Sequence, residues 1–494
     1  MHTRKHLAPG LMLTMALLAG CASMGDRIAH SRPENVDGLQ AHRTLAPAKL
    51  AEARWPATDW WKDLGDPQLD KLEAETLAGS PTLKMAKARV DKARALAGMA
   101  KSTLAPQVNA NFQATYQRFS EHGVVPPPVA GSWRAQGQLA LDAGYEFDFW
   151  GRHRAQLDAA LGHVAAAKVD AFATRLLLSV QVARTYVELS RLYDQRDIAE
   201  ATFTQRRKIY DLTRRRVAAG IDSRVELKQA EGALPASREA IAALNEAISR
   251  TRHQLAALLG QGPDRGLQIH RPALPGTNDA IALPSRLPAE LLGRRPDVVA
   301  GRWRVEAAAQ NIKTATASFY PNVDLLAYAG LQSLGLGHLL TLGSGIGGVG
   351  PAVTLPVFEG GRLRAQLVST DANYNLAVER YNRILVEALH DIGDQIAAAR
   401  SVKTQISAQR SACADAREAY KLARQRYGAG IGSYLSVLSA EAAVLQQRHL
   451  AVDLRARRLE NNIDLVRALG GGFDETILTG HSAPTGTIQK RKTS

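Results

Sequence analysis

Two stretches decide the fold: RRRVAAGIDSRVELKQAE at residues 214–231 and RQRYGAGIGSYLSVLSAE at residues 424–441. They lie 210 residues apart (424 minus 214), and at that spacing both contain Ala-Gly-Ile-x-Ser. The glycine follows a long charged segment that favours a helix, and glycine just past a helix end supplies the positive φ of a C-cap. The serine that follows is a good N-cap for a second helix. Each stretch therefore predicts a turn between two helices, and the chain contains that turn twice.

The segments that flank these turns predict long helices. From 152 to 217 and from 362 to 427 there is no proline, and apolar residues recur at spacings of three and four. A helix of about 66 residues would extend roughly 100 Å, so it needs partners along its length, as in a coiled coil or a helical barrel. Shorter helices are expected at 223–259 and 433–469 after the turns, and at 81–104 and 296–319, where proline occupies the first turn.

Alternating apolar and polar residues predict four strands, at about 106–119, 135–148, 321–334 and 346–358. About ten alternating residues fit the wall of a membrane β-barrel, with apolar side chains outward and polar ones inward. Four strands cannot enclose a water-filled pore, and open edges are not tolerated in lipid, so other copies of the chain must complete the barrel. Asp142, Glu146 and Asp148 share the polar face, where they would favour cations in a lumen or would simply be solvated interior residues.

The N-terminus has the features of an export signal. Charged residues precede an apolar run at 7–18, which is shorter than the about 20 residues of a membrane-spanning helix. The run ends in LAGC, which looks like a bacterial lipobox with Cys21 as the acylated first residue of the mature protein; the alternative is an ordinary signal peptide with a chance cysteine. Ala22 resembles the residue of lipoproteins that are sorted to the outer membrane. Cys413, the only other cysteine, is expected to be a small packed side chain without a disulfide partner.

Composition and motifs argue against several other functions. The net charge of +15 is spread along helices among acidic residues, which indicates solvated surfaces rather than a nucleic-acid site. GSGIGG at 343–348 fits a dinucleotide pattern, but an alternating strand follows it where that site needs a helix. The 13 histidines show no metal-ligand spacing, and no nucleophile elbow or phosphate-binding loop occurs. We therefore expect no catalytic residue, no metal and no cofactor beyond the N-acyl diglyceride and palmitate on Cys21.

Four further motifs resemble the outer-membrane efflux factors of Gram-negative bacteria, TolC-like and in the NodT-type lipoprotein branch. They are WWKDLGDPQLDKLEAETLAGS from Trp60, YEFDFWGR from Tyr145, LLGRRPDV from Leu291 and ASFYPNVDL from Ala317. The resemblance covers roughly residues 55–473 and implies an α+β membrane protein. In it, a homotrimer forms a 12-stranded β-barrel, four strands per protomer, continuous with a periplasmic α-helical barrel of long coiled-coil helices. It also implies a periplasmic membrane-fusion adaptor and an inner-membrane RND-type pump as partners, and Trp60 and Trp61 are expected to pack in an equatorial collar.

The expected organisation follows from the internal two-fold repeat. Its parts are a lipoprotein signal peptide at 1–20, a lipid anchor and equatorial segment at 21–80, one repeat at 81–280, a second at 281–475 and a flexible tail at 476–494.

The expected function is an outer-membrane channel of a tripartite efflux system that passively conducts drugs and other toxic small molecules from the periplasm to the exterior. The alternative is a periplasmic coiled-coil adaptor or structural lipoprotein that does not span the membrane and has no need of alternating strands. The two turns are expected to dock the adaptor and form the gate, through Gly220, Ile221, Asp222, Ser223, Gly430, Ile431, Gly432 and Ser433. The branch often has an acid where this chain has Gly432, and small residues where it has Asp222. An acidic ring at the periplasmic entrance would thus lie on the first hairpin, or be weaker.

Overall fold

The computed structural model describes residues 27–34, 39, 44, 55–275 and 293–475. The expected signal peptide, Cys21 and the C-terminal tail lie outside these residues. The described chain forms two compact units. The strand unit contains residues up to 33, 89–167 and 301–382, and the hairpin unit contains 34–88, 168–300 and the residues from 383 onward. Each unit therefore holds segments from both expected repeats.

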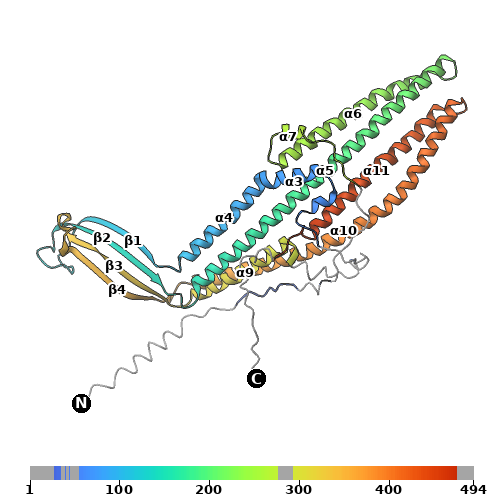
Figure 1. The fold of residues 1–494 in the computed structure, drawn as a ribbon. Helices are drawn as coiled ribbons and strands as arrows, with labels where there is room; N and C mark the ends of the chain where they lie inside the picture. Colours follow the sequence, from blue (N-terminus) through green and yellow to red (C-terminus); the bar gives the residue numbers. More distant parts are fainter. Residues whose placement is uncertain (1–26, 35–38, 40–43, 45–54, 276–292, 476–494) are drawn as a thin grey trace, which may run out of the picture. The chain divides into compact units, whose positions relative to one another are not determined.

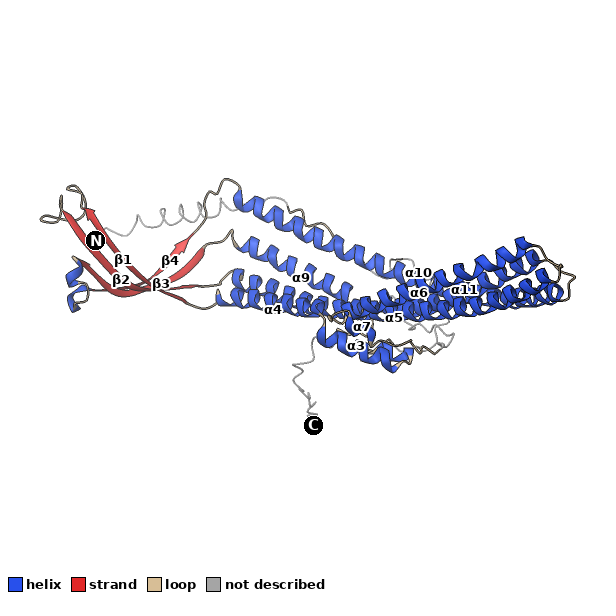
Figure 2. Ribbon diagram, turned by 90° about the horizontal axis from the view of Figure 1, so that it is seen from above, coloured by secondary structure: helices blue, strands red, loops and turns tan. Residues whose placement is uncertain are grey.

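The strand unit is built on one antiparallel sheet (Figures 1 and 2). Its strands, in the spatial order β1-β2-β3-β4, are β1 (Gln107–Arg118), β2 (Trp133–Glu146), β3 (Asn322–Leu334) and β4 (Gly345–Thr354). β2 and β3 pair from Gln136↔Leu334 to Glu146↔Asp324, which joins the two halves of the sequence in one sheet. β1 and β4 are the edges, and each pairs on one side only among the described residues.

The sheet carries exposed apolar side chains on its first strands. Val108, Phe112 and Tyr116 are spaced four residues apart along β1 and are all more than 60% exposed, and Trp133 of β2 stacks on Tyr116 with 5.5 Å between ring centroids. Alternate positions of a strand point to the same face. The expected apolar face therefore exists on β1, and no described residue covers it.

Two strands differ from their expected bounds. β2 ends at Glu146, so Asp148 lies beyond it, and β4 ends at Thr354 rather than at 358. Pro351 lies within β4, where proline is tolerated because an edge strand has unpaired N–H positions. The GSGIGG segment enters β4 directly, and no helix follows it.

Six of the described helices form three pairs of equal length. α5 (Arg152–Ala218) and α10 (Arg362–Gly428) have 67 residues each, α6 (Arg224–Leu258) and α11 (Tyr434–Ala468) have 35 each, and α4 (Pro81–Ser102) and α9 (Pro296–Ala317) have 22 each. Within the described residues, no helix combines the length and the apolar character needed to cross a membrane.

The core of the hairpin unit lies where a short helix, α3 (Pro67–Gly79), packs against α5, α6 and α11. Trp60 and Trp61, from the 3-10 helix η2 (Trp60–Leu64), are both buried in it. Buried Asp66 caps α3 at Gln68 N and accepts hydrogen bonds from Tyr186 Oη (2.6 Å) and Ala273 N (2.7 Å). One carboxylate thus fixes the N-terminal segment, α5 and the chain beyond α7 (Asp264–Leu267) to each other.

Glu73 is the unusual member of this core. Its side chain is fully buried on α3, and neither carboxylate oxygen forms a hydrogen bond with a described residue. Burial disfavours the ionised form and raises the pKa of Glu73 to about 8. The side chain is therefore a neutral carboxylic acid at neutral pH.

We expect Glu73→Gln to remove a pH dependence of stability. The folded state of the wild type binds more protons than the unfolded chain between the ordinary value of 4.5 and about 8, so stability is full below that window and falls as pH rises through it, by up to about 1.4 kcal/mol per pH unit. Thermal unfolding of the detergent-solubilised protein at about pH 5 and about pH 9 measures this difference. Glu75→Gln, on the same helix, should keep the wild-type dependence, and an unchanged dependence in Glu73→Gln would contradict the assignment.

Candidate functional site

The two predicted turns have the same backbone construction. Gly220 and Gly430 have φ values of 74° and 82°, which a residue with a Cβ adopts only at a cost. After each glycine, the isoleucine N–H reaches back into the helix, from Ile221 N to Arg216 O (2.9 Å) and from Ile431 N to Arg426 O (3.1 Å). This is the Schellman pattern that satisfies the last carbonyls of a helix.

The serines begin the second helix of each hairpin. Ser223 accepts a hydrogen bond from Val225 N, and Glu226 accepts one from Ser223 N, so α6 begins with a capping box. Ser433 accepts a hydrogen bond from Ser436 N at the start of α11. Ser223 and Ser433 therefore have the capping role that the sequence predicts for them.

Asp222 is held in an ion pair that also contacts the second hairpin. Arg216 donates to it in a bidentate manner, at 2.8 and 2.9 Å, and Tyr427 Oη of α10 donates to it at 2.6 Å. Arg216 also donates to the carbonyl of Tyr427 (2.7 Å) and lies over the ring of that tyrosine, 4.4 Å from its centroid. Thr213 of α5 lies 2.9 Å from Tyr427 Oη. We call Thr213, Arg216, Asp222 and Tyr427 the tip cluster.

The protonation states within the tip cluster are defined by its contacts. The Arg216 guanidinium, with the Tyr427 hydroxyl, holds the pKa of Asp222 below its ordinary value of 3.8. Burial, reinforced by the hydrogen bond to Asp222, raises the pKa of Tyr427 to about 12. At neutral pH a phenol therefore donates to a carboxylate, and the Thr213 hydroxyl must be the donor to Tyr427 Oη.

Steric crowding at the second turn explains why position 432 is a glycine. A Cβ at this position would lie 2.9 Å from the backbone nitrogen of Tyr427 and 3.1 Å from the carbonyl carbon of Arg426. Such a contact is too short to persist without a shift of the backbone. The second turn therefore approaches its own helix too closely to carry an acidic side chain at 432 in this conformation.

A second polar cluster joins the hairpins further from the turns. Glu441 of α11 is buried and accepts hydrogen bonds from Arg206 Nε (3.1 Å) and Gln205 Nε2 (3.2 Å) of α5. Arg206 also donates to Ser237 of α6 at 3.1 Å. A further ion pair links Arg191 to Asp453 at 3.0 Å. These contacts join α5 to α6 and to α11.

Sequence reasoning missed the partners in both clusters. Tyr427 lies 205 positions from Asp222, and Glu441 lies 235 positions from Arg206. Arg216 is only six positions from Asp222, within the same quoted stretch, but the sequence pattern alone does not show that the two side chains pair. One difference between the two stretches could have indicated a special role for Tyr427: the first stretch has Val217 at the equivalent position.

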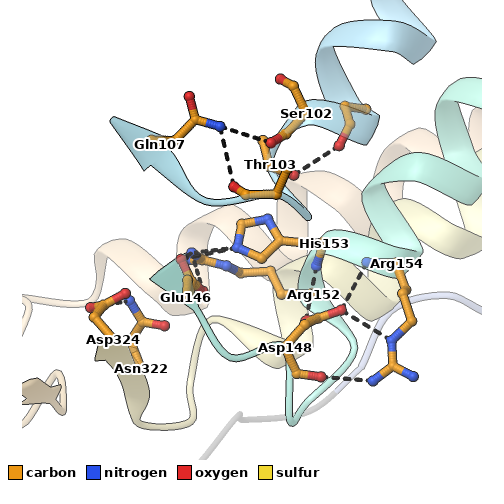
Figure 3. Close-up of polar contacts among 12 residues, drawn as sticks. Ser102, Thr103, Gln107, Glu146, Asp148, Arg152, His153, Arg154, Asn322 and Asp324 are labelled. Carbon is orange, nitrogen blue, oxygen red and sulfur yellow. Dashed lines mark hydrogen bonds and ion pairs between the residues drawn. The ribbon is translucent and has the colours of Figure 1, made fainter. Parts of the chain in front are cut away.

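The three acids of the strand unit have different surroundings, and Figure 3 shows two of them, Glu146 and Asp148. Asp142 accepts a hydrogen bond from Asn111 of the neighbouring strand. Glu146 forms an ion pair with Arg152 (2.6 Å) and lies 2.9 Å from His153 Nε2. Asp142 therefore lies within β2, whereas Glu146 lies at the junction between β2 and α5.

Asp148 caps the long helix. It accepts hydrogen bonds from the backbone N–H groups of His153 (3.1 Å) and Arg154 (3.0 Å), and from Arg154 Nε (3.2 Å) (Figure 3). A carboxylate at a helix N-terminus satisfies free donors and complements the helix dipole. This capping explains why β2 ends before Asp148.

In the part of the chain that the structure describes, the remaining cysteine and the possible metal ligands show no functional site. Cys413 is buried and free. Among the described residues, no group of three or more histidine, cysteine or acidic side chains is arranged to hold a metal ion.

The fold and these sites define a class: a chain that pairs an exposed, open antiparallel sheet with long antiparallel helical hairpins. Its sequence matches the model of the family described as "Outer membrane efflux protein" over residues 72–261 and 287–471. The chain belongs to the outer membrane efflux protein family.

Individual relatives agree with this family. The chain is 40% identical over 375 residues to fusaric acid resistance protein FusA of Burkholderia cepacia, covering 75% of this chain and 70% of FusA. It is 32% identical over 468 residues to multidrug resistance outer membrane protein MdtP of Escherichia coli strain K12, covering 92% and 94% of the two chains. Among solved structures, the outer membrane protein VceC of Vibrio cholerae has a TM-score of 0.79 at 38% identity, over 85% of this chain and all of VceC (100%).

We expect Tyr427→Phe to loosen the turns. The change removes the hydrogen bonds to the Asp222 carboxylate and to Thr213 while the Arg216 ion pair remains, at a cost of about 2 kcal/mol. Backbone amides at 219–223 should then exchange with deuterium roughly thirtyfold faster. Tyr420→Phe is the matched control, because the Tyr420 hydroxyl is buried without a hydrogen bond among the described residues. Equal exchange in both variants would show that the tip cluster does not hold the turns.

Proposed function

We propose that this chain is the outer-membrane channel of a tripartite efflux system. It passively conducts drugs and other toxic small molecules from a periplasmic membrane-fusion adaptor and an RND-type inner-membrane pump to the exterior. Family membership supports the channel assignment, and the family comprises efflux proteins rather than enzymes. The relatives named for fusaric acid resistance and multidrug resistance support small toxic molecules as the substrate class.

The observation that carries this proposal is the open sheet. β1 and β4 are both unpaired on their outer sides among the described residues, and β1 exposes a row of apolar side chains. In lipid, unpaired backbone groups cost several kcal/mol each, so such a sheet must close on itself or on other copies. Three copies of four strands form a 12-stranded barrel wide enough for a pore. A homotrimer with one barrel and a periplasmic helical tunnel is therefore the arrangement we propose.

The two turns are the proposed docking and gating surface. In this arrangement the residues at 220–223 and 430–433 form the periplasmic ends of the tunnel. Exposed Ile221 and Ile431, at 58% and 70% of their full accessible area, offer apolar contact to an adaptor. The tip cluster joins the two hairpins of one protomer, so a partner that separates the turns must break it.

Two further assignments complete the proposal. Asp142 and Glu146 face the lumen near the base of the barrel, with Asp148 at the start of α5, and they give the passage a local preference for cations. Cys21 carries the N-acyl diglyceride and palmitate that anchor the chain in the outer membrane. The chain consists of two copies of one structural repeat, which the equal lengths of α5 and α10 support.

We expect Gly430→Pro and Asp222→Lys each to raise drug susceptibility without preventing trimer assembly. Proline fixes φ near −65°, which is incompatible with the observed 82°, and Asp222→Lys places a cation beside Arg216. Susceptibility of a deletion strain complemented with each variant, with cross-linking of the membranes, measures both effects. Glu231→Lys, an exposed reversal further along α6, is the control. Wild-type susceptibility in both turn variants would contradict the docking and gating role of the turns. Membranes that yield only monomers on cross-linking would contradict the trimer.

We expect Cys21→Ala to abolish incorporation of labelled palmitate, because the thioether to the diglyceride requires that thiol. The Cys413→Ser variant should label as the wild type does, since Cys413 is buried in the hairpin unit. Label retained in Cys21→Ala would show that the lipid is attached elsewhere.

A further inference from the structure

The two loops at the free end of the sheet differ in charge. Both lie at the same end, because the strands are antiparallel (Figure 2). The loop at 119–132, between β1 and β2, contains Glu121, which pairs with Arg118 at 2.7 Å. From 325 to 358, by contrast, the chain contains no aspartate, glutamate, lysine or arginine. The loop at 335–344, between β3 and β4, can therefore enter an apolar medium without carrying a carboxylate, ammonium or guanidinium group with it. We call it the leucine loop.

The leucine loop folds back onto the apolar face of the sheet. A Cβ at Gly137 of β2 would lie 2.8 Å from Leu336 Cδ2 and 3.2 Å from Leu339 Cδ2, and Leu339 is buried there. Gly137 precedes Leu139 by two residues, and Leu139 pairs with Phe112 of β1. Since alternate positions of a strand share a face, Gly137 opens on the side that carries Phe112. The loop therefore covers the apolar side of the sheet and not its polar side.

An aromatic pair marks the depth at which the leucine loop lies. Gly335 N donates to Ala135 O at 2.7 Å, and Ala135 pairs with Tyr116, whose ring stacks on Trp133. Amphipathic aromatic side chains favour the interface between membrane and water, and they flank the apolar band of a membrane barrel. Gly137, which the loop covers, lies two residues further from the free end of the sheet than Ala135. In the proposed barrel, the folded-back leucines therefore lie on the hydrocarbon side of this aromatic pair.

The polar groups of the leucine loop turn inward, whereas its remaining leucines turn outward. Thr341 Oγ1 and Ser344 Oγ each donate to the carbonyl of His338, at 2.7 Å. Leu340 and Leu342 are exposed, Leu342 completely. Hydrogen bonds within the loop lower the cost of moving its polar atoms out of water. His338 is the single ionisable side chain of the loop, and an imidazole can lose its proton on entering an apolar medium.

We propose that the leucine loop binds the outer leaflet of the outer membrane, with Leu340 and Leu342 inserted among the lipid chains. This inference rests on the barrel proposed above, and it assigns one of the external loops to the lipid rather than to the solvent or the pore mouth. Burial of apolar area drives the insertion, and no carboxylate, ammonium or guanidinium group opposes it. The loop thus extends the lipid contact of the strands and fixes the depth of the barrel in the membrane.

A fluorescent probe on the loop tests this contact. In a Cys413→Ser background reconstituted into phosphatidylcholine vesicles, a nitrobenzoxadiazole probe on Leu342→Cys should show blue-shifted emission and quenching by nitroxide groups on the lipid acyl chains. The same probe on Val124→Cys is the matched control, because Val124 is an equally exposed apolar residue of the β1–β2 loop. It should emit as it does in water and resist the quencher. The background protein should take no label, since Cys21 is acylated.

A third probe position separates the loop from the barrel. Phe112→Cys places the probe on the apolar face of β1. A quenched probe at Phe112 with a water-like probe at Leu342 would overturn the inference and leave the barrel intact. Unquenched probes at both positions would overturn both. A blue-shifted probe at Leu342 that the lipid does not quench would place the leucines against another copy of the loop, and would equally overturn the assignment to lipid.

A charge placed in the loop tests what drives the insertion. Leu340→Asp, combined with the probe at Leu342, should lower the quenching by lipid, because a carboxylate is costly in an apolar medium. Leu340→Met keeps the apolar character and should leave the quenching unchanged. Equal quenching in both variants would show that the leucines do not hold the loop in the lipid.

Discussion

The structure depends on one constraint: helices of 67 residues need lateral partners along their whole length. The hydrogen bonds of a helix are local, so they give no rigidity against bending over many turns, and most helical stability in proteins comes from packing. In the hairpin unit α5 is supported by α6, α11 and α3, through the buried cluster around Tyr186 and through the polar contacts of Arg206 with Glu441 and Ser237. α6 and α10 have uncovered outer faces, and the sheet has uncovered edges. The same need for a partner therefore recurs at both units.

The features that could be predicted from the sequence are the local ones. A helix end needs a residue with positive φ and a following N-cap, and both requirements are met within five residues, so Gly220 and Ser223 were interpretable without any three-dimensional information. The strands were recognisable because alternation has a period of two. Their ends were less certain, because Asp148 continues the alternation but is used as a helix cap. A pattern of polarity cannot distinguish a carboxylate on a strand face from one that binds helix N–H groups.

The role of Asp222 could not be predicted for a different reason. From the sequence alone, Asp222 is expected to be an exposed acid on a turn. Its oxygens instead bind Arg216 and Tyr427, and Tyr427 of α10 is 205 positions away in the chain. Positions 210 apart have also diverged into complementary roles. Asp222 supplies a carboxylate, whereas Gly432 must remain small beside Tyr427. Glu441 is buried under Arg206, whereas Glu231 forms a surface pair with Lys228. Similar turns therefore carry different chemistry, which a comparison of the two stretches alone does not show.

The hydrogen bonds of the tip cluster are weak enough for the binding of a partner to break them. A hydrogen bond to a charged group contributes about 1.5–3 kcal/mol, and a neutral one about 1 kcal/mol. A partner shifts the arrangement of the turns only by the difference between its affinities for the joined and the separated hairpins. The polar joining contacts of the tip cluster lie within two turns of the helix ends, and a buried apolar cluster that includes Ile209, Tyr434 and Val437 also joins the hairpins there. A docking surface must therefore favour the separated turns by more than the polar contacts alone contribute. The polar contacts of Glu441, further from the turns, would then hold α5 and α11 together while the ends move, which confines the change to the exposed tips.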